Sequence, residues 1–322
     1  MTELVCMNRA QIKDPEMKKA FPAAMKKMFA DYPNVVYMDA DLMRAMGTVE
    51  LWKNYPERVV QCGIAEANMV GVAAGMSSEG MIPFAHTFAS FASRRVFDQV
   101  FMSCAYAGLN VKIIGSDPGA VAQLNGGTHT ANEDIAMMRT LPNVEIVDVT
   151  DAVVLPQILQ QTANQYGTFY IRLPRCAVPR VYADDAKVTL GKASTLRNGK
   201  DLTIIACGIE VSEALDAAEM LVIDGIEARV LDMFTIQPLD REAVIAAARE
   251  TGAIVTAENH SINGGLGAAV AECLGENCPV PMERVGNLGE FGDVGKLSYL
   301  KTHYHLAAED IAEKARKVIE RK

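Results

Sequence analysis

Two short segments carry side chains that could hold and activate a ligand. Glu66 stands where a predicted strand, 58–61, passes into a predicted apolar helix, 67–76. An acid in that place can face a ligand at the carboxyl edge of a sheet, although the helix dipole also favours Glu in a first turn. Phe88 and Phe91 are three residues apart, so on a helical turn they would form an aromatic wall on one face. A carboxylate and a flat apolar surface are thus available to a ligand.

A third segment, Asn125-Gly126-Gly127-Thr128-His129, suits proton transfer. Its two glycines let the backbone come close to a ligand. A neutral imidazole near physiological pH can accept or donate a proton. His129 is therefore a candidate acid–base residue, although an isolated His is more often structural.

Arginines near these segments are candidate anion ligands. Arg172 and Arg175 stand at the end of a predicted strand, 169–173. Arg94 and Arg95 follow the aromatic pair. A guanidinium can fork onto a phosphate, sulfonate or carboxylate. The alternative for Arg94 and Arg95 is a solvated helix face.

The elements that must position these side chains alternate along the chain. Asp14-Pro15 is a predicted helix start, because proline is favoured at the first helical position. Predicted helices separate apolar runs that predict strands at 34–38, 81–84, 111–114, 144–149 and 169–173. This alternation is typical of a doubly wound parallel sheet.

The second half of the chain repeats the pattern after a stretch without helical period, 174–199. Its predicted strands are 202–207, 228–233 and 253–257, and its predicted helices are 211–223, 241–250 and 309–322. A chain of 322 residues exceeds the usual size of one domain. We therefore expect an α/β protein of two doubly wound domains, 1–186 and 187–322.

Composition narrows the classes of partner. Lys plus Arg number 31 against 40 Asp plus Glu, which gives a formal charge of −9 and argues against nucleic acid or an anionic membrane as the main partner. No stretch reaches the roughly twenty apolar residues that cross a bilayer. The seven cysteines are scattered, and no His lies near to complete a metal site. We expect a soluble, cytoplasmic protein that binds no metal itself.

These motifs together resemble the transketolase family. Glu66, Thr87-Phe88-Ala89-Ser90-Phe91 and the Thr-His turn resemble its pyrimidine-binding domain. Two later segments, 232–239 and 258–267, resemble its C-terminal domain, so that the resemblance covers nearly the whole chain.

The resemblance implies thiamine diphosphate as the cofactor and assigns roles to the candidate residues. Glu66 takes the place of the acid that hydrogen-bonds the aminopyrimidine and so activates the cofactor. Phe91 stacks on the ring with Phe88 beside it, and Asp41 matches an acid near the cofactor at the boundary between subunits. His129 takes the place of a His near the reacting carbonyl.

A missing motif implies a partner. Enzymes of this kind hold Mg²⁺ and the diphosphate with a Gly-Asp-Gly segment, and this sequence contains none. The resemblance therefore implies a separate N-terminal subunit that carries this motif and binds the Mg²⁺. It also implies self-association through both domains in a two-plus-two assembly.

Departures from the family pattern concern the substrate. Asn125 replaces an Asp, Ser116 a His, Ala45 a Ser and Lys18 an Arg that sugar-phosphate transketolases place around the substrate. The available anion ligands are Arg94, Arg172 and Arg175, and the resemblance leaves open which of the last two binds the head group. We expect an unusual head group. A second Gly-rich segment, 263–267, follows His260 and suggests a structural turn or a remnant anion site.

The function that follows is transfer of a two-carbon ketol unit from a ketose to an aldose. The alternatives are the β subunit of a 2-oxoacid dehydrogenase E1 and one half of a deoxyxylulose-phosphate synthase. The Thr-His turn and the Phe pair favour transketolase. A regulatory homodimer without catalysis is the alternative of another class.

Overall fold

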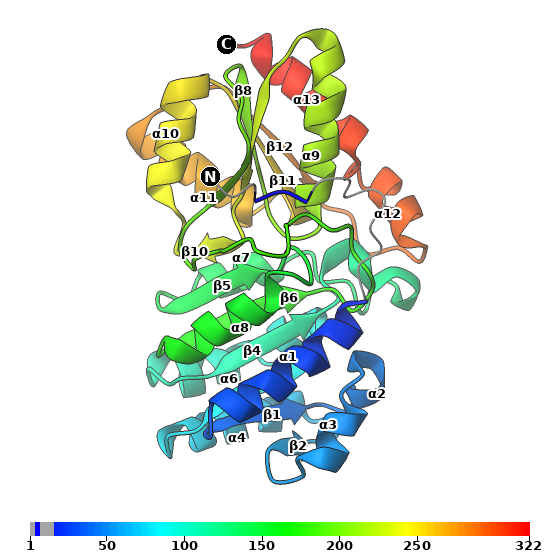
Figure 1. Cartoon of the computed structure of the whole chain (residues 1–322), viewed down its shortest axis with the longest axis vertical. Coiled ribbons are helices and arrows are strands. Elements are labelled where there is room, and N and C mark those ends of the chain that lie inside the picture. Colours follow the sequence, from blue (N-terminus) through cyan, green and yellow to red (C-terminus); the bar gives the residue numbers. More distant parts are fainter. Residues whose placement is uncertain (1–3, 7–15) are drawn as a thin grey trace.

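A computed structural model describes residues 4–6 and 16–322, so the predicted helix start at Asp14-Pro15 lies outside the described residues. Two units, each built on a mostly parallel sheet flanked by helices, are stacked along the long axis (Figure 1). This arrangement confirms the predicted α/β class with two doubly wound domains. The boundary at 186/187 stays a prediction.

The first sheet has seven strands within the described residues, in the order β10-β5-β6-β4-β3-β1-β2. Its neighbouring strands run parallel except for β10, which is antiparallel to β5. The strands are β1 (Val35–Asp39), β2 (Val59–Gln61), β3 (Ile82–Phe88), β4 (Lys112–Ser116), β5 (Val144–Asp148), β6 (Thr168–Leu173) and β10 (Thr235–Gln237).

Helices cover both faces of this sheet because its strands are apolar on both sides. In β1, Val35 and Tyr37 belong to one buried apolar cluster, and Val36 and Met38 to another. In Figure 1, α1 and α8 lie in front of the sheet and α4 lies behind it. The helices and helical turns of this unit are α1 (Met17–Asp31), α2 (Met43–Met46), α3 (Val49–Asn54), α4 (Glu66–Ser78), α5 (Ala89–Ser93), α6 (Phe97–Gln99), η2 (Val100–Tyr106), η3 (Gly119–Asn125), α7 (Asp134–Arg139) and α8 (Leu155–Asn164).

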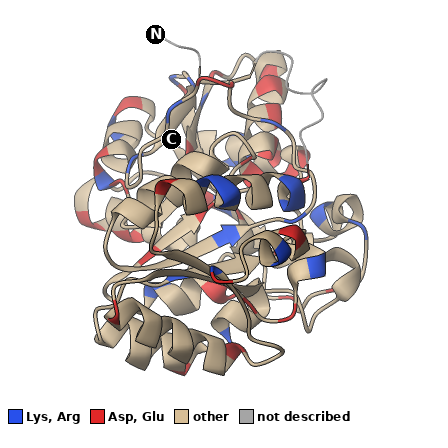
Figure 2. Ribbon diagram, turned by 60° about the horizontal axis from the view of Figure 1, so that its bottom comes forward, with Lys and Arg blue, Asp and Glu red and all other residues tan. Residues whose placement is uncertain are grey.

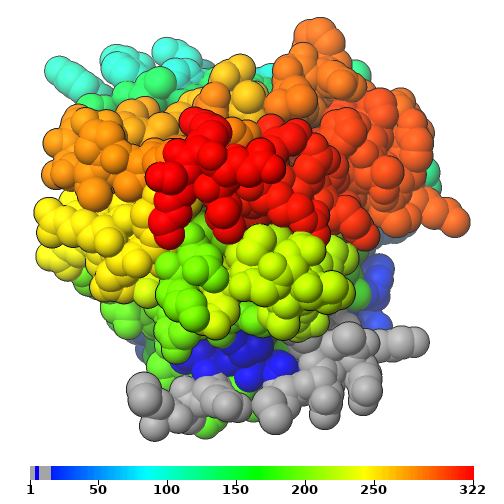
Figure 3. All heavy atoms as spheres, turned by 90° about the horizontal axis from the view of Figure 1, so that it is seen from above, coloured from blue at the N-terminus to red at the C-terminus, as the bar shows by residue number. Residues whose placement is uncertain are grey.

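The second sheet, in the order β12-β11-β8-β9-β7, is parallel except at β7. Its strands are β7 (Ser194–Arg197), β8 (Leu202–Ala206), β9 (Ala228–Asp232), β11 (Ile254–Ser261) and β12 (Met282–Asn287). The C-terminal helix α13 lies beside α9 in this second unit (Figure 3). The helices and turn of this unit are α9 (Glu210–Leu221), η4 (Val222–Asp224), α10 (Arg241–Thr251), α11 (Leu266–Asn277), α12 (Leu297–His303) and α13 (Ala308–Ile319).

Contacts between the two units include a shared sheet and a buried charge network. Strand β10 comes from the second half of the chain but extends the first sheet by pairing with β5. Arg172 of β6 is completely buried, forms ion pairs with Asp134 and Asp148, and donates to the carbonyl of Asn259 in β11 at 2.9 Å. A buried charge is tolerated only when it is paired and hydrogen-bonded, and here the partners come from both units.

Acidic and basic residues are interspersed over both units (Figure 2). Within the described residues no helix is both long enough and apolar enough to cross a membrane.

Glu210 gives this fold a testable dependence on pH. It begins α9, is fully buried, and neither of its carboxyl oxygens has a hydrogen-bond partner in the described part of the chain. Burial raises the pKa of Glu210 to about 8, although Lys301 opposes the rise. The folded state therefore keeps a proton that the unfolded state loses, and the resulting stability disappears as the pH rises toward 8.

We expect Glu210→Gln to remove this dependence. Between roughly pH 5 and pH 8 the free energy of unfolding should shift in favour of the variant by up to about 1.4 kcal/mol per pH unit. Denaturant titrations of both chains across this range give the difference, in which groups common to the two chains cancel. A difference that stays constant with pH would contradict the assignment.

Candidate active site

Glu66 lies at the carboxyl edge of the first sheet, as predicted. Strand β2 ends at Gln61, and Glu66 is the first residue of α4. Its side chain is only 4% exposed, and its Oε1 accepts a hydrogen bond from Nη1 of Arg95 at 2.7 Å. The carboxylate is therefore held at one oxygen by a cation from a different element.

Phe88, Phe91 and His129 form an aromatic cluster. Phe88 is the last residue of β3 and Phe91 lies in the following turn of helix, α5. Their ring centroids are 6.1 Å apart, and the imidazole of His129 stands edge-on to both, at 5.5 and 5.2 Å. Edge-to-face contacts of this length are favourable. The two motifs predicted from sequence thus meet in space.

Two guanidinium groups lie over the rings of this cluster. The Cζ atom of Arg95 is 3.8 Å from the ring centroid of Phe91, and that of Arg175 is 4.8 Å from Phe88. Both distances are within the range of cation–π attraction. Arg95 is four residues after Phe91, in the turn that follows α5.

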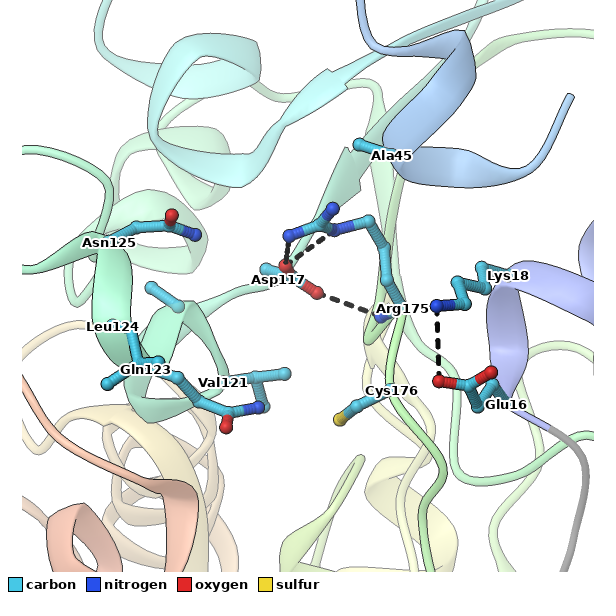
Figure 4. A pocket seen from close by; sticks show the side chains of 11 residues that line it. Glu16, Lys18, Ala45, Asp117, Val121, Gln123, Leu124, Asn125, Arg175 and Cys176 are labelled. Carbon is cyan, nitrogen blue, oxygen red and sulfur yellow. Dashed lines mark hydrogen bonds and ion pairs between the residues drawn. The ribbon is translucent and has the colours of Figure 1, made fainter. Parts of the chain in front are cut away.

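A pocket of about 250 Å³ lies next to the aromatic cluster (Figure 4). Arg175 connects the two, since it lines the pocket and also lies over the ring of Phe88. Two cations line the pocket, and each has a carboxylate partner. Arg175 is paired with Asp117 at 2.5 Å, and Lys18 with Glu16 at 3.2 Å. The other lining residues are Ala45, Val121, Ala122, Gln123, Leu124, Asn125 and Cys176.

Four positions that depart from the sugar-phosphate pattern are placed by this geometry. Asn125, Ala45 and Lys18 line the pocket. Ser116 lies beneath it, fully buried, with its hydroxyl 2.9 Å from Nε2 of His86. The departures in sequence therefore gather at one place in the structure.

Asp117 was missed by the sequence analysis, although it directly follows β4 at the carboxyl edge. Burial raises the pKa of Asp117, and the neighbouring guanidinium of Arg175 opposes the rise. Its carboxylate also accepts a hydrogen bond from the Arg175 backbone at 2.8 Å. Asp117 thus fixes both the main chain and the side chain of the arginine that faces the pocket.

A buried polar chain behind the pocket was also missed. Asp39 accepts from the hydroxyl of Tyr37 at 2.6 Å and contacts Nδ1 of His86 at 2.8 Å, and His86 continues to Ser116. These residues lie on the neighbouring strands β1, β3 and β4, so the pairing of the strands brings them together. Because Ser116 directly precedes Asp117, these hydrogen bonds within the sheet support a residue that lines the pocket.

The second unit supports the pocket as well. Asn259, in β11, accepts from the backbone N–H of Ala120 at 2.8 Å and donates to the carbonyl of Pro118 at 2.9 Å. Gly119 lies between them with φ +54, and a Cβ there would meet Asn259 at 2.3 Å. The segment that carries Asn125 is thus fastened to the C-terminal half of the chain.

The three predicted anion ligands occupy different surroundings. Arg175 faces the pocket, whereas Arg172 forms ion pairs with Asp134 and Asp148 and does not line the pocket. Arg94 pairs with Glu133 at 3.0 Å and donates to the carbonyl of Thr128 at 3.1 Å. It therefore braces the Thr-His turn and is not among the residues that line the pocket.

Asp41 and the Gly-rich segment 263–267 were the remaining candidates from the sequence. Asp41 is exposed just beyond β1, with φ +63, and its backbone N–H donates to Gln61 at 3.0 Å. At the Gly-rich segment 263–267, the carboxylate of Glu258 accepts from the N–H groups of Leu266 and Gly267, at 2.7 and 2.8 Å. The start of α11 is therefore capped by the chain's own acid, which leaves a structural role for the turn.

Comparison with known proteins identifies the family of the chain. Residues 13–180 match the pyrimidine binding domain of transketolase, and residues 191–311 match the transketolase C-terminal domain. The chain therefore belongs to the transketolase family, as the motifs around Glu66 and His129 indicated.

Individual relatives refine this placement. The chain is 52% identical to the 6-deoxy-6-sulfo-D-fructose transketolase subunit SqwH of Clostridium sp. over 89% of both chains. It is 40% identical to an apulose-4-phosphate transketolase subunit of Phocaeicola vulgatus, over 92% of this chain and 96% of that one. A split gene transketolase solved as an inactive beta4 tetramer has 41% identity and a TM-score of 0.88, over 96% of this chain and all of that one.

The site can be compared with the needs of thiamine diphosphate. The guanidinium of Arg95 contacts both a buried carboxylate, Glu66, and an aromatic face, Phe91. Such a pair fits an aminopyrimidine ring that must be both hydrogen-bonded and stacked. The Mg²⁺ that accompanies this cofactor would also need ligands. Among residues 4–6 and 16–322, no group of three or more His, Cys, Asp or Glu side chains is placed to hold a metal ion.

Proposed function

We propose that this chain is the C-terminal subunit of a split, thiamine-diphosphate-dependent transketolase. The observation that supports the proposal is that Phe91 packs against His129 and is linked through Arg95 to the carboxylate of Glu66, next to the pocket that Arg175 lines. Thiamine diphosphate, when bound, supplies the carbon nucleophile that carries a two-carbon ketol unit from a ketose to an aldose. The chain supplies orientation, proton control and part of the substrate pocket.

Each residue has a separate task in this proposal. Glu66 holds a proton between its carboxylate and a ring nitrogen of the aminopyrimidine, with Phe88 and Phe91 as the stacking surface. His129 gives or takes the proton of a substrate hydroxyl, because its imidazole stands at the edge of that surface and imidazole is the side chain most often used for proton transfer. Asp41 lies at the boundary with another subunit.

The cofactor's diphosphate and Mg²⁺ belong to a separate N-terminal subunit in this proposal. The sequence has no Gly-Asp-Gly, and the sulfofructose and apulose-4-phosphate relatives are themselves named as subunits. The beta4 tetramer of the split gene relative supports self-association of this chain. We propose a two-plus-two assembly that contains both subunits.

The pocket favours a head group with one negative charge. Its two cations are each paired with a carboxylate, Arg175 with Asp117 and Lys18 with Glu16, so the four formal charges cancel. A phosphate carries about −1.5 to −2 near pH 7, and a sulfonate carries a single charge. A sulfonated sugar therefore meets less repulsion from the two carboxylates, and the relative SqwH is named for such a substrate. We propose Arg175 as the ligand of the head group.

Isolation of the assembly from native extract tests the proposal. We expect a second chain of about 270–300 residues that contains Gly-Asp-Gly to purify with this one, as identified by mass spectrometry. Ketol transfer should require both chains. Full activity of this chain alone, or pyruvate decarboxylation in place of ketol transfer, would refute the proposal.

A further inference from the structure

Arg95 makes the two contacts that the proposed cofactor ring needs. Its guanidinium donates to the carboxylate of Glu66 at 2.7 Å and lies 3.8 Å from the ring centroid of Phe91. These are the hydrogen-bonding group and the stacking surface of the proposed cofactor site. One side chain therefore engages both at once.

The chemistry of the two groups explains this overlap. A guanidinium is a flat amidine-type cation that stacks on aromatic faces and donates to carboxylates from its edge. An aminopyrimidine is likewise flat and presents nitrogen atoms along its edge. A site shaped for a carboxylate hydrogen bond plus a ring stack accepts either group, but Glu66 and Phe91 cannot serve both in the same places.

The two partners differ in freedom to move. The Arg95 side chain is 44% exposed, whereas that of Glu66 is 4% exposed. Arg95 also lies between the short helices α5 and α6, outside regular strand or long helix. Movement of Arg95 therefore costs little packing, whereas movement of Glu66 would disturb the start of α4.

We propose that Arg95 is an internal occupant of the aminopyrimidine site, which the cofactor must displace. This inference rests on the proposed function. In the subunit without cofactor, Arg95 compensates the buried carboxylate and covers Phe91. When the cofactor binds, the guanidinium turns out toward solvent, and the lost contacts subtract from the affinity.

Calorimetric titration of the two-subunit complex with thiamine diphosphate and Mg²⁺ tests this inference. We expect Arg95→Met to tighten binding about three- to thirty-fold, because displacement of a half-exposed ion pair and a cation–π contact is no longer required. Arg95→Gln, a polar variant, serves if the Met variant does not fold, and should shift affinity in the same direction.

The matched control is Arg241→Met. Arg241 is 50% exposed and forms an ion pair with Glu276 at 2.6 Å on the second unit, so its loss should leave cofactor affinity within about twofold of wild type. Unchanged or weaker binding in the Arg95 variants would overturn the displacement. Absence of binding in the wild-type complex would instead overturn the proposed function, and the inference with it.

Discussion

Glu66→Gln should leave the two-subunit complex intact and reduce its turnover by about 10²- to 10⁴-fold, the usual range for loss of a proton-handling group. Glutamine has nearly the same shape, so the start of α4 and the packing around it persist. It cannot share a proton with the aminopyrimidine as a carboxylic acid does. The chemical step is therefore lost while the fold remains.

Two measurements separate this role from a structural one. Exchange of the cofactor's C2 proton, followed by NMR in the assembled complex, should slow together with turnover. Glu79→Gln, at the exposed C-terminal end of the same helix, should behave as wild type in both. Wild-type exchange in the Glu66 variant would show that another group activates the cofactor.

The second large effect concerns the head group. We expect kcat/KM for a sulfonated ketose to exceed that for xylulose 5-phosphate by about ten- to a hundred-fold, because each polar contact that one anion makes and the other lacks is worth roughly 1–3 kcal/mol. The comparison uses the reconstituted enzyme with phosphorylated, sulfonated and unphosphorylated ketoses.

A variant with altered pocket charge tests whether the pocket causes this preference for sulfonate over phosphate. Glu16→Gln frees Lys18 from its carboxylate partner and leaves the pocket with a net positive charge, so the preference should shift toward phosphate. Glu50→Gln breaks a comparable exposed pair with Lys53 on α3 and should not change the preference. If kcat/KM in the wild type is much higher for xylulose 5-phosphate with ribose 5-phosphate than for the sulfonated ketose, the proposed effect of pocket charge is wrong.

The strands and helices could be predicted because hydrophobic periodicity determines them, and most ends differ by only a few residues. Among the strands of the first sheet that were predicted, the largest difference is at β3, predicted as 81–84 and observed to end at Phe88. His86 and Thr87 ended the apolar run in sequence, yet both are buried, because His86 belongs to the polar chain with Asp39. Tertiary partners of this kind leave no periodic signal.

Other features needed the folded chain. Strand β10 is only three residues long and pairs with β5 from the other half, so no local pattern could place it. Arg172 and Arg175 looked equivalent at the end of one strand, and only the distant acids Asp134 and Asp148 distinguish the buried one. Arg95 did carry a local signal, since it follows Phe91 by one helical turn, but its pairing with Glu66 joins separate elements.

In the proposed enzyme, this chain contributes the pyrimidine side of a cofactor site whose diphosphate side lies on another subunit. Titration calorimetry of the folded chain alone, and of the chain with its partner, measures this directly with thiamine diphosphate and Mg²⁺. We expect no tight binding to the lone chain and saturable binding to the complex, because the diphosphate and metal ligands supply most of the affinity. Micromolar or tighter binding by the lone chain, a free energy of about −8 kcal/mol or beyond, would contradict the account.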